Sequence, residues 1–194
     1  MTGRTILLVA AATALVASAC TTPDGRPPDA SPPAPSSSTT SSVDANADEA
    51  LRGELYGIAL ARLVTTDNTF GEGFRFTEIL VQTSTDPGAG GAERRGERRP
   101  LTDAERAGIE TALAPLGSFR WIDDPETWRT PDLMPVVEGS AIVGVGEVRF
   151  RDGVALVPVS LWCGGLCGLS ATYRLVRTGG GWQVEGFEGP VAIS

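Results

Sequence analysis

The segment ALVPVSLWCGGLCGLSATYRL, residues 155–175, decides the fold because its alternating side chains fix how two strands pair. Apolar residues occupy every second position on either side of the central glycines, as in strands that turn one face to a core. Putting both apolar sets on one face pairs Leu161 with Leu169, Val159 with Ala171, Val157 with Tyr173 and Ala155 with Leu175. A slip of one residue would turn the whole set toward solvent, so the register is well determined.

The same register brings the two cysteines of this segment together. Cys163 is predicted to lie directly opposite Cys167, across a loop that runs from Gly164 to Leu166. Directly opposed residues have Cα atoms about 4.5–5.5 Å apart, within the range that a disulfide spans. A redox site would need C-x-x-C at a helix N-terminus, and a zinc site would need further Cys or His ligands. We therefore predict a structural disulfide, worth only about 1–2 kcal/mol because the loop is short.

The alternation continues through the last third of the chain, where four strands joined by tight turns are expected. They cover residues 141–150, 154–162, 169–177 and 182–186. Asp152-Gly153 is a strong two-residue hairpin motif between the first two. Extending this hairpin places Gly144 and Gly146 beside the apolar face and leaves a hollow there, which a helix could fill or which could form a small apolar pocket.

Two helices are expected before these strands. The first covers residues 48–64 on the basis of one apolar stripe, in which Gly53 and Gly57 either weaken the helix or mark a close approach to the sheet. The second begins with a capping box formed by Thr102 and Glu105.

Residues 74–83 and 118–123 predict one or two additional strands. The fold class is therefore α+β: an antiparallel β-meander of about four strands plus one or two further strands, with two helices packed on one face. The opposite face of the meander carries Leu156, Trp162 and Arg174, which would form a contact surface if no other element covers them.

The N-terminal residues predict export. Residues 1–19 have one Arg followed by an apolar run shorter than the roughly 20 residues that cross a bilayer, as in a signal peptide. Cys20 follows small residues in a lipobox-like context, so we expect it to be lipidated, palmitate included. The alternative is secretory cleavage after Ala19, which would release a soluble protein.

Residues 20–46 are rich in Pro, Ser and Thr, which predicts a flexible tether, and residues 47–194 form a single domain. The expected location is extracytoplasmic, lipid-anchored to the cell membrane. The net charge of −8 argues against nucleic acid as a partner. The chain contains no His and no Lys, which excludes a Ser-His-Asp triad, an imidazole metal ligand, a Schiff base and a P-loop. No cofactor or metal is expected, and the sequence leans away from an enzyme.

The C-terminal residues resemble the pattern of a loosely defined group of exported bacterial proteins: a CG-x-LCG hairpin, W-x-V and a closing I-S. The positions that carry this resemblance are Cys163, Gly164, Leu166, Cys167, Gly168, Trp182, Val184, Ile193 and Ser194. The resemblance covers roughly the last fifty residues and implies export and a disulfide-bonded hairpin; the group has no assigned activity.

Three carboxylates, Asp123, Asp124 and Glu126, could serve as a general acid/base pair or bind a hard cation, although Asp and Pro equally form turns. A second cluster is positive: Arg94, Arg95, Arg98 and Arg99 could contact an anionic envelope polymer or form a solvated loop. Arg177 is expected opposite Trp182, in a cation–π contact.

The sequence thus leaves three functions open. The first is an envelope-anchored, non-catalytic binding or interaction module whose partner is an envelope protein, polymer or lipid. The second is a carboxylate-dependent hydrolase that acts on cell-envelope polymer. The third is a carrier of a small apolar ligand or lipid.

Overall fold

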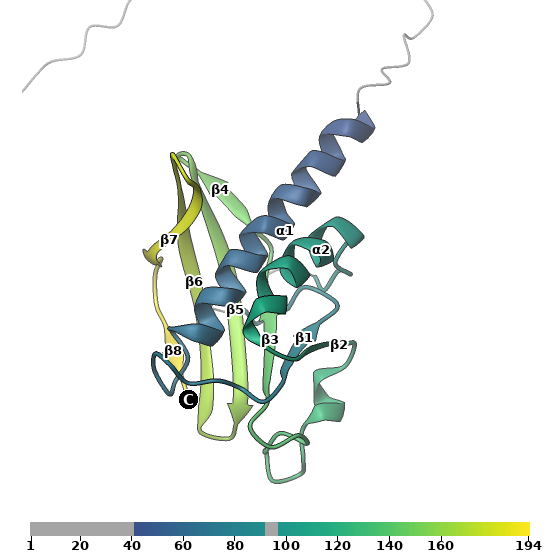
Figure 1. Ribbon diagram of the computed structural model, residues 1–194, viewed down its shortest axis with the longest axis vertical. Helices are drawn as coiled ribbons and strands as arrows, with labels where there is room; N and C mark the ends of the chain where they lie inside the picture. The colour runs from purple at the N-terminus through teal and green to yellow at the C-terminus, as the bar shows by residue number, and fades with distance from the viewer. Residues whose placement is uncertain (1–40, 92–96) are drawn as a thin grey trace, which may run out of the picture. The chain divides into compact units, whose positions relative to one another are not determined.

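The computed structural model describes residues 41–91 and 97–194, which fall in one compact unit, Ser38–Ser194 (Figure 1). The predicted signal peptide, Cys20 and most of the predicted tether lie outside the described residues, as do Arg94 and Arg95. The helices are α1 (Ser41–Thr65) and α2 (Asp103–Leu113), with two 3₁₀ turns, η1 (Ala114–Leu116) and η2 (Pro125–Trp128). The strands are β1 (Ile79–Gln82), β2 (Phe119–Ile122), β3 (Ala141–Val145), β4 (Arg149–Arg151), β5 (Val154–Gly164), β6 (Cys167–Thr178), β7 (Gly181–Phe187) and β8 (Ala192–Ile193).

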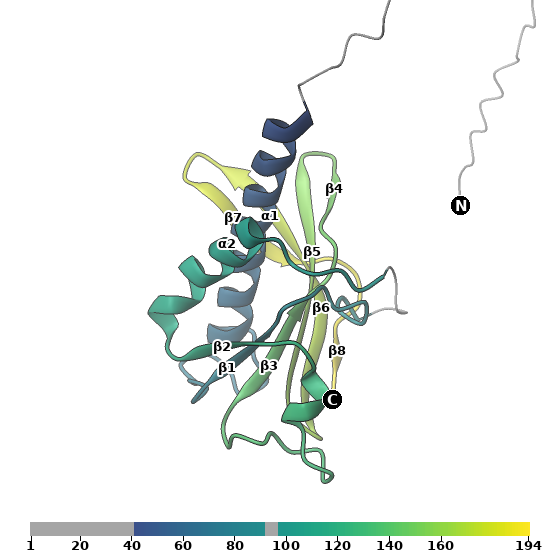
Figure 2. The same ribbon diagram turned by 90° about the vertical axis from the view of Figure 1, so that its right-hand side faces the viewer.

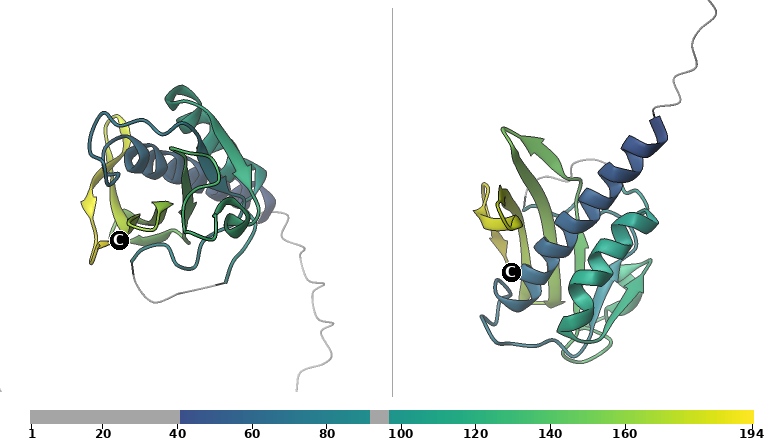
Figure 3. Two further views of the ribbon diagram at one scale, coloured as in Figure 1. Left: turned by 90° about the horizontal axis from the view of Figure 1, so that it is seen from below. Right: turned by 45° about the horizontal axis from the view of Figure 1, so that its top comes forward.

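The strands form one sheet in the order β2-β1-β3-β5-β6-β7, with β4 beside β5 and β8 beside β6. β1 runs parallel to both β2 and β3, whereas the pairs from β3 to β7 are antiparallel. Helices α1 and α2 lie side by side on one face of this sheet (Figure 3). The predicted α+β class is therefore confirmed, with an antiparallel meander extended by two parallel strands.

The predicted register of β5 and β6 is confirmed at all four apolar pairs, from Ala155–Leu175 to Leu161–Leu169. The pairing of the cysteines differs in one detail. A β-bulge follows Trp162, so that Cys167 lies opposite Gly164 instead of Cys163. The disulfide still forms, with Cα atoms 5.1 Å apart, because the bulge moves the opposed backbone by a single residue.

The prediction of one continuous strand over residues 141–150 was wrong. The ladder breaks at residues 146–148, where this side of the hairpin has one residue more than β5. Because of this extra residue, residues 141–145 turn the opposite side chains toward the helices from those predicted. Gly144 pairs with Ser160 and faces away from the helices. A Cβ on Gly144 would lie 2.6 Å from Nε2 of Gln82, so the hollow predicted on the core face does not exist and the space beside Gly144 is filled.

The core lies between the helices and the sheet. Its fully buried large side chains include Leu55, Tyr56, Leu60, Leu63, Ile109, Leu113, Tyr173 and Leu175. The glycines of α1 allow a close approach to α2 and not to the sheet: a Cβ on Gly108 would lie 2.2 Å from the carbonyl carbon of Gly53. The predicted capping box of α2 is present, since Thr102 accepts from the amide of Glu105 and Glu105 accepts from the amide of Thr102.

The other face of the sheet is covered in part by irregular segments. Leu80, Ile122 and Ile142 form a small second core there, against Trp128 and Trp162. The C-terminus pairs with β6 near the β5–β6 turn, at the end of the domain away from the start of α1 (Figure 2).

Candidate interaction site

The three predicted carboxylates each have a role within the fold. Thr83 donates to Asp123 over 2.6 Å, and Asp124 caps η2 by accepting from the amide of Glu126 over 2.9 Å. Glu126 pairs with Arg129 at 2.6 Å. Within residues 41–91 and 97–194, no group of three or more His, Cys, Asp or Glu side chains could hold a metal ion. The geometry of these carboxylates therefore favours turn and cap roles over acid/base chemistry.

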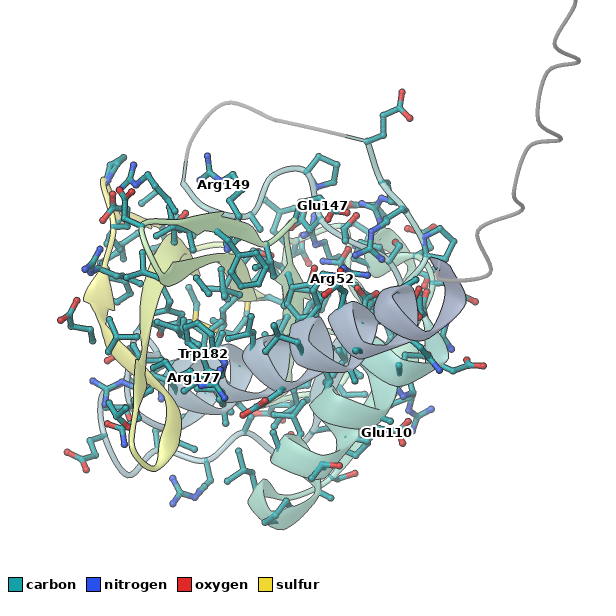
Figure 4. The ribbon with its side chains drawn as sticks, turned by 90° about the horizontal axis from the view of Figure 1, so that it is seen from above. Arg52, Glu110, Glu147, Arg149, Arg177 and Trp182 are labelled. Carbon is teal, nitrogen blue, oxygen red and sulfur yellow. A yellow bond between two sulfur atoms is a disulfide. The ribbon has the colours of Figure 1, made fainter. Side chains whose placement is uncertain are left out.

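A cluster of ion-paired side chains around one buried carboxylate, Glu105, lies where both helices meet the sheet. We call Arg52, Arg99, Glu105 and Glu147 the Glu105 cluster. Glu105 has no solvent exposure and accepts from Arg52 at 2.6 Å and from Arg99 at 2.7 Å. Arg99 also pairs with Glu147 at 2.5 Å, which ties α2 to the segment between β3 and β4. Arg52 and Glu147 are labelled in Figure 4.

Burial alone would raise the pKa of Glu105, but hydrogen bonds from Arg99, Arg52 and the amide of Thr102 outweigh it and hold that pKa below its ordinary value. Burial, together with the charge of Glu105, raises the pKa of the neighbouring Tyr56 hydroxyl above its ordinary value. Glu105 thus stays ionised and Tyr56 stays neutral near pH 7. This is the electrostatics of a structural clamp and not of a proton-transferring pair.

A second buried polar contact closes the other end of α1. The Tyr173 hydroxyl donates to Asp67 over 2.9 Å, and Arg62 donates to the same carboxylate over 2.8 Å. Burial, then the charge of Asp67, raises the pKa of Tyr173 above its ordinary value. This contact joins the loop after α1 to β6, in the interior of the domain.

The predicted contact surface does not form one exposed patch. Leu156 is only 4% exposed, Trp162 is half-buried with the Arg129 guanidinium 4.6 Å from its ring centre, and Arg174 pairs with Glu185. Arg177 lies opposite Trp182 as predicted (Figure 4), but no cation–π contact joins them among the described residues.

Leu156 instead lies in a groove of about 480 Å³ on the face of the sheet away from the helices. Gly146 and Pro158 also line this groove, with Arg151 and Glu188 on its walls. Arg151 and Glu188 pair with each other, so the charge of the walls is largely balanced. The volume suits a small ligand, and the lining also includes the charged side chains of Asp86, Glu147 and Arg149, which do not favour an apolar one.

Figure 1 shows the end of α1 and the β5–β6 turn at the end of the domain opposite the start of α1, and the segments there carry exposed large apolar residues. We call Phe70, Leu133, Met134 and Leu166 the distal apolar end. Leu166, in the β5–β6 turn, is 93% exposed, and the other three are more than half exposed. Exposed apolar groups gathered in this way are typical of interaction sites.

Contacts between loops hold this end together. A Cβ on Gly164 would lie 3.7 Å from the Met134 sulfur, and one on Gly165 would lie 3.7 Å from the Leu133 Cβ. Thr69, next to Phe70, hydrogen-bonds the Cys167 sulfur over 3.1 Å. Segments far apart in sequence therefore meet at this end, where the Phe70 ring itself stacks on that of Phe74, with ring centroids 4.2 Å apart.

Leu133 has a positive φ of 56°, a conformation that leucine rarely adopts. Thr130 stabilises this turn: its carbonyl accepts from the Leu133 amide over 2.9 Å, and its hydroxyl accepts from the Met134 amide over 3.1 Å. The strained backbone of Leu133 leaves its side chain in solvent, so the strain does not improve packing. Backbone strain without a packing benefit is concentrated at functional sites.

Sequence reasoning identified Cys163 and Cys167 but missed most of the distal apolar end. Leu133 and Met134 lie between Pro131 and Pro135, in a segment for which the sequence predicted neither a helix nor a strand. Two large apolar side chains in a proline-bounded polar loop are unusual, and that pattern could have identified them.

Within the described part of the chain, no helix combines the length and the apolarity needed to span a bilayer. A scan against protein-family models, a search of curated proteins and a search of solved structures each return no match.

Proposed function

We propose that this chain is a lipid-anchored extracytoplasmic module that binds a partner protein through the distal apolar end, without catalysis. The observation that carries the proposal is the exposure of four large apolar side chains at one end of a domain whose other large apolar residues are mostly buried. A water-soluble domain gains nothing in folding from such exposure, whereas binding would bury these side chains.

The N-terminal sequence supports the anchor. A cysteine at position 20 follows an apolar run, and a Pro, Ser and Thr-rich segment separates it from the folded domain. A disulfide also fits an oxidising compartment outside the cytoplasm. The start of α1, the first described element, lies at the end of the domain opposite the distal apolar end.

The hydrolase alternative has less support because Asp123, Asp124 and Glu126 are engaged by Thr83, a backbone amide and Arg129. The carrier alternative would use the groove beside Leu156, but the charged side chains of its lining, among them Asp86, Arg149 and the Arg151–Glu188 pair, do not suit a small apolar ligand.

The test is crosslinked capture from cells that produce the wild type, Leu166→Asp or Phe150→Asp. Phe150 is the matched control because it is 55% exposed but lies on β4, outside the distal apolar end. We expect a partner protein whose recovery falls at least tenfold with Leu166→Asp and is unchanged with Phe150→Asp. The purified partner should then bind Leu166→Asp with a dissociation constant at least tenfold higher than for the wild type, and Phe150→Asp with an unchanged one.

Equal recovery of all proteins by the wild type and by Leu166→Asp would contradict the proposal. So would an equal loss with Phe150→Asp, because the effect would then come from any added surface charge.

A further inference from the structure

We infer that the Cys163–Cys167 disulfide serves recognition more than global stability: it holds the turn from Gly164 to Leu166 rigid, so that Leu166 can enter an apolar pocket on a folded partner protein. This inference rests on the proposed function. It adds the role of the disulfide and the chemistry of the surface that the distal apolar end would meet.

The fold has little need of this bond for stability. The two cysteines are only four positions apart, and closing so short a loop removes little entropy from the unfolded chain. β5 and β6 are already paired along their length, from Val154–Val176 to Trp162–Gly168, with a buried apolar face. These contacts hold the hairpin together without the sulfur atoms.

The turn, in contrast, has few constraints beyond the hydrogen bond of Thr69 to the Cys167 sulfur. Regular pairing ends at the bulge after Trp162, and Gly164 has a φ of +147°, in the region that favours glycine. Gly165 adds further backbone freedom, and Leu166 at 93% exposure has almost no packing of its own. The disulfide closes the loop at the point where the ladder becomes irregular.

Rigidity at this point would matter for binding. An exposed side chain on a mobile turn loses conformational entropy when a partner immobilises it, whereas a turn that is already fixed loses little. The hydrogen bond between Thr69 and the Cys167 sulfur extends the fixed region to the loop after α1. A few side chains that fill well-packed, desolvated pockets carry most of the energy of an interface, and a fixed Leu166 could fill one.

Charge indicates the kind of partner. The chain has a net charge of −8 and no lysine, so an anionic bilayer would repel it. Asp132 and Glu72 lie exposed next to Leu133 and Phe70 within the same loops. The distal apolar end therefore fits a protein pocket that is apolar inside and neutral or basic at its rim.

The first test needs no partner. In the full chain, the double variant Cys163→Ser/Cys167→Ser and the wild type reduced and alkylated at both cysteines are compared with the oxidised wild type. We expect the melting temperature to fall by less than about 6 °C. Amide hydrogen exchange at residues 164–167 should become at least tenfold faster, while exchange in the centre of β5 stays unchanged.

Unchanged exchange in the turn would overturn the inference, because the turn would then be rigid without the disulfide. Failure of both disulfide-free preparations to fold would overturn it as well, because the bond would then be required for global stability.

The second test uses the partner captured through Leu166. The dissociation constant should rise at least tenfold for the double cysteine variant and stay unchanged for Phe150→Asp. Normal binding by the cysteine variant, together with loss of binding by Leu166→Asp, would refute the inference and leave the proposed function intact.

A third experiment tests whether the distal apolar end binds a bilayer instead. It uses vesicles of phosphatidylethanolamine and phosphatidylglycerol at 7:3 and the Cys20→Ser variant, which cannot be lipidated. We expect no cosedimentation. Cosedimentation that is lost with Leu166→Asp would overturn the assignment of a protein pocket.

Discussion

Glu105 is a carboxylate without solvent exposure, surrounded by two arginines and by the amide of Thr102. Replacing it by Gln keeps the volume but removes the charge that both guanidinium groups face. We expect Glu105→Gln to lower the free energy of unfolding by about 2–3 kcal/mol, less than for a fully buried pair because Arg52 and Arg99 can regain water. Denaturant unfolding at pH 7 measures the free energy of unfolding, and Glu54→Gln, at an exposed position, is the control. Equal stability of the two variants would contradict a stabilising role for the ion pairs of Glu105.

The same carboxylate predicts how stability depends on pH. Because the folded-state pKa of Glu105 lies below its ordinary value of 4.5, its stabilising effect is complete above about pH 4.5 and is lost as the pH falls through the folded-state pKa. The difference in unfolding free energy between the wild type and Glu105→Gln should thus be largest near neutral pH and shrink in acid. A difference that grows in acid would show that the folded-state pKa is raised instead.

These residues also show what can be predicted at this scale. The capping box follows from the spacing of Thr102 and Glu105, because both partners lie within one helical turn. The pairing of Glu105 with Arg52 joins residues 53 positions apart, and no local pattern records it. The sequence contains 16 cations, all Arg, and composition cannot show which of them meets a buried carboxylate.

At the scale of elements, the contact between α1 and α2 depends on glycine. Replacing Gly by Ala in an exposed helix usually adds about 1 kcal/mol of stability. Gly108→Ala should instead cost more than about 2 kcal/mol, because its Cβ would lie 2.2 Å from the backbone of Gly53 and backbone cannot move aside as a side chain can. Gly186→Ala, which would meet open space, is the control. Urea denaturation measures both variants, and we expect Gly108→Ala to be the less stable of the two. If Gly108→Ala were instead the more stable variant, the helices would not be in contact there.

Elements also differ in how far the sequence determines them. The pairing of β5 with β6 follows from alternation alone, because a slip would expose the whole apolar face. The bulge at residues 146–148 inserts one residue, and because Gly146, Glu147 and Val148 still alternate between non-polar and polar, the sequence pattern did not indicate it. The parallel position of β1 between β2 and β3 depends on pairs such as Ile79–Phe119 and Ile79–Ala141, which are far apart in sequence and which periodicity does not contain.

At the scale of the whole molecule, the proposal separates two functions along the chain: an anchor at the N-terminus and a binding end away from the start of α1. Lipidation would bury two or three acyl chains in the bilayer at about 0.8 kcal/mol per CH₂, enough for stable attachment. The folded domain begins beyond the tether, so loss of the anchor should change location without changing the fold.

Cys20→Ser tests this directly. The wild type should remain with the membrane fraction and incorporate labelled palmitate, whereas Cys20→Ser should incorporate none and leave the membrane fraction, with a melting temperature within about 1 °C of the delipidated wild type. Thr21→Ser, one position along, should behave as the wild type does. A wild type found in the culture medium without label would instead favour cleavage after Ala19, and the partner of the distal apolar end would then be sought beyond the membrane surface. That outcome would leave the interaction proposal standing, because exposure of Leu166 does not depend on the anchor.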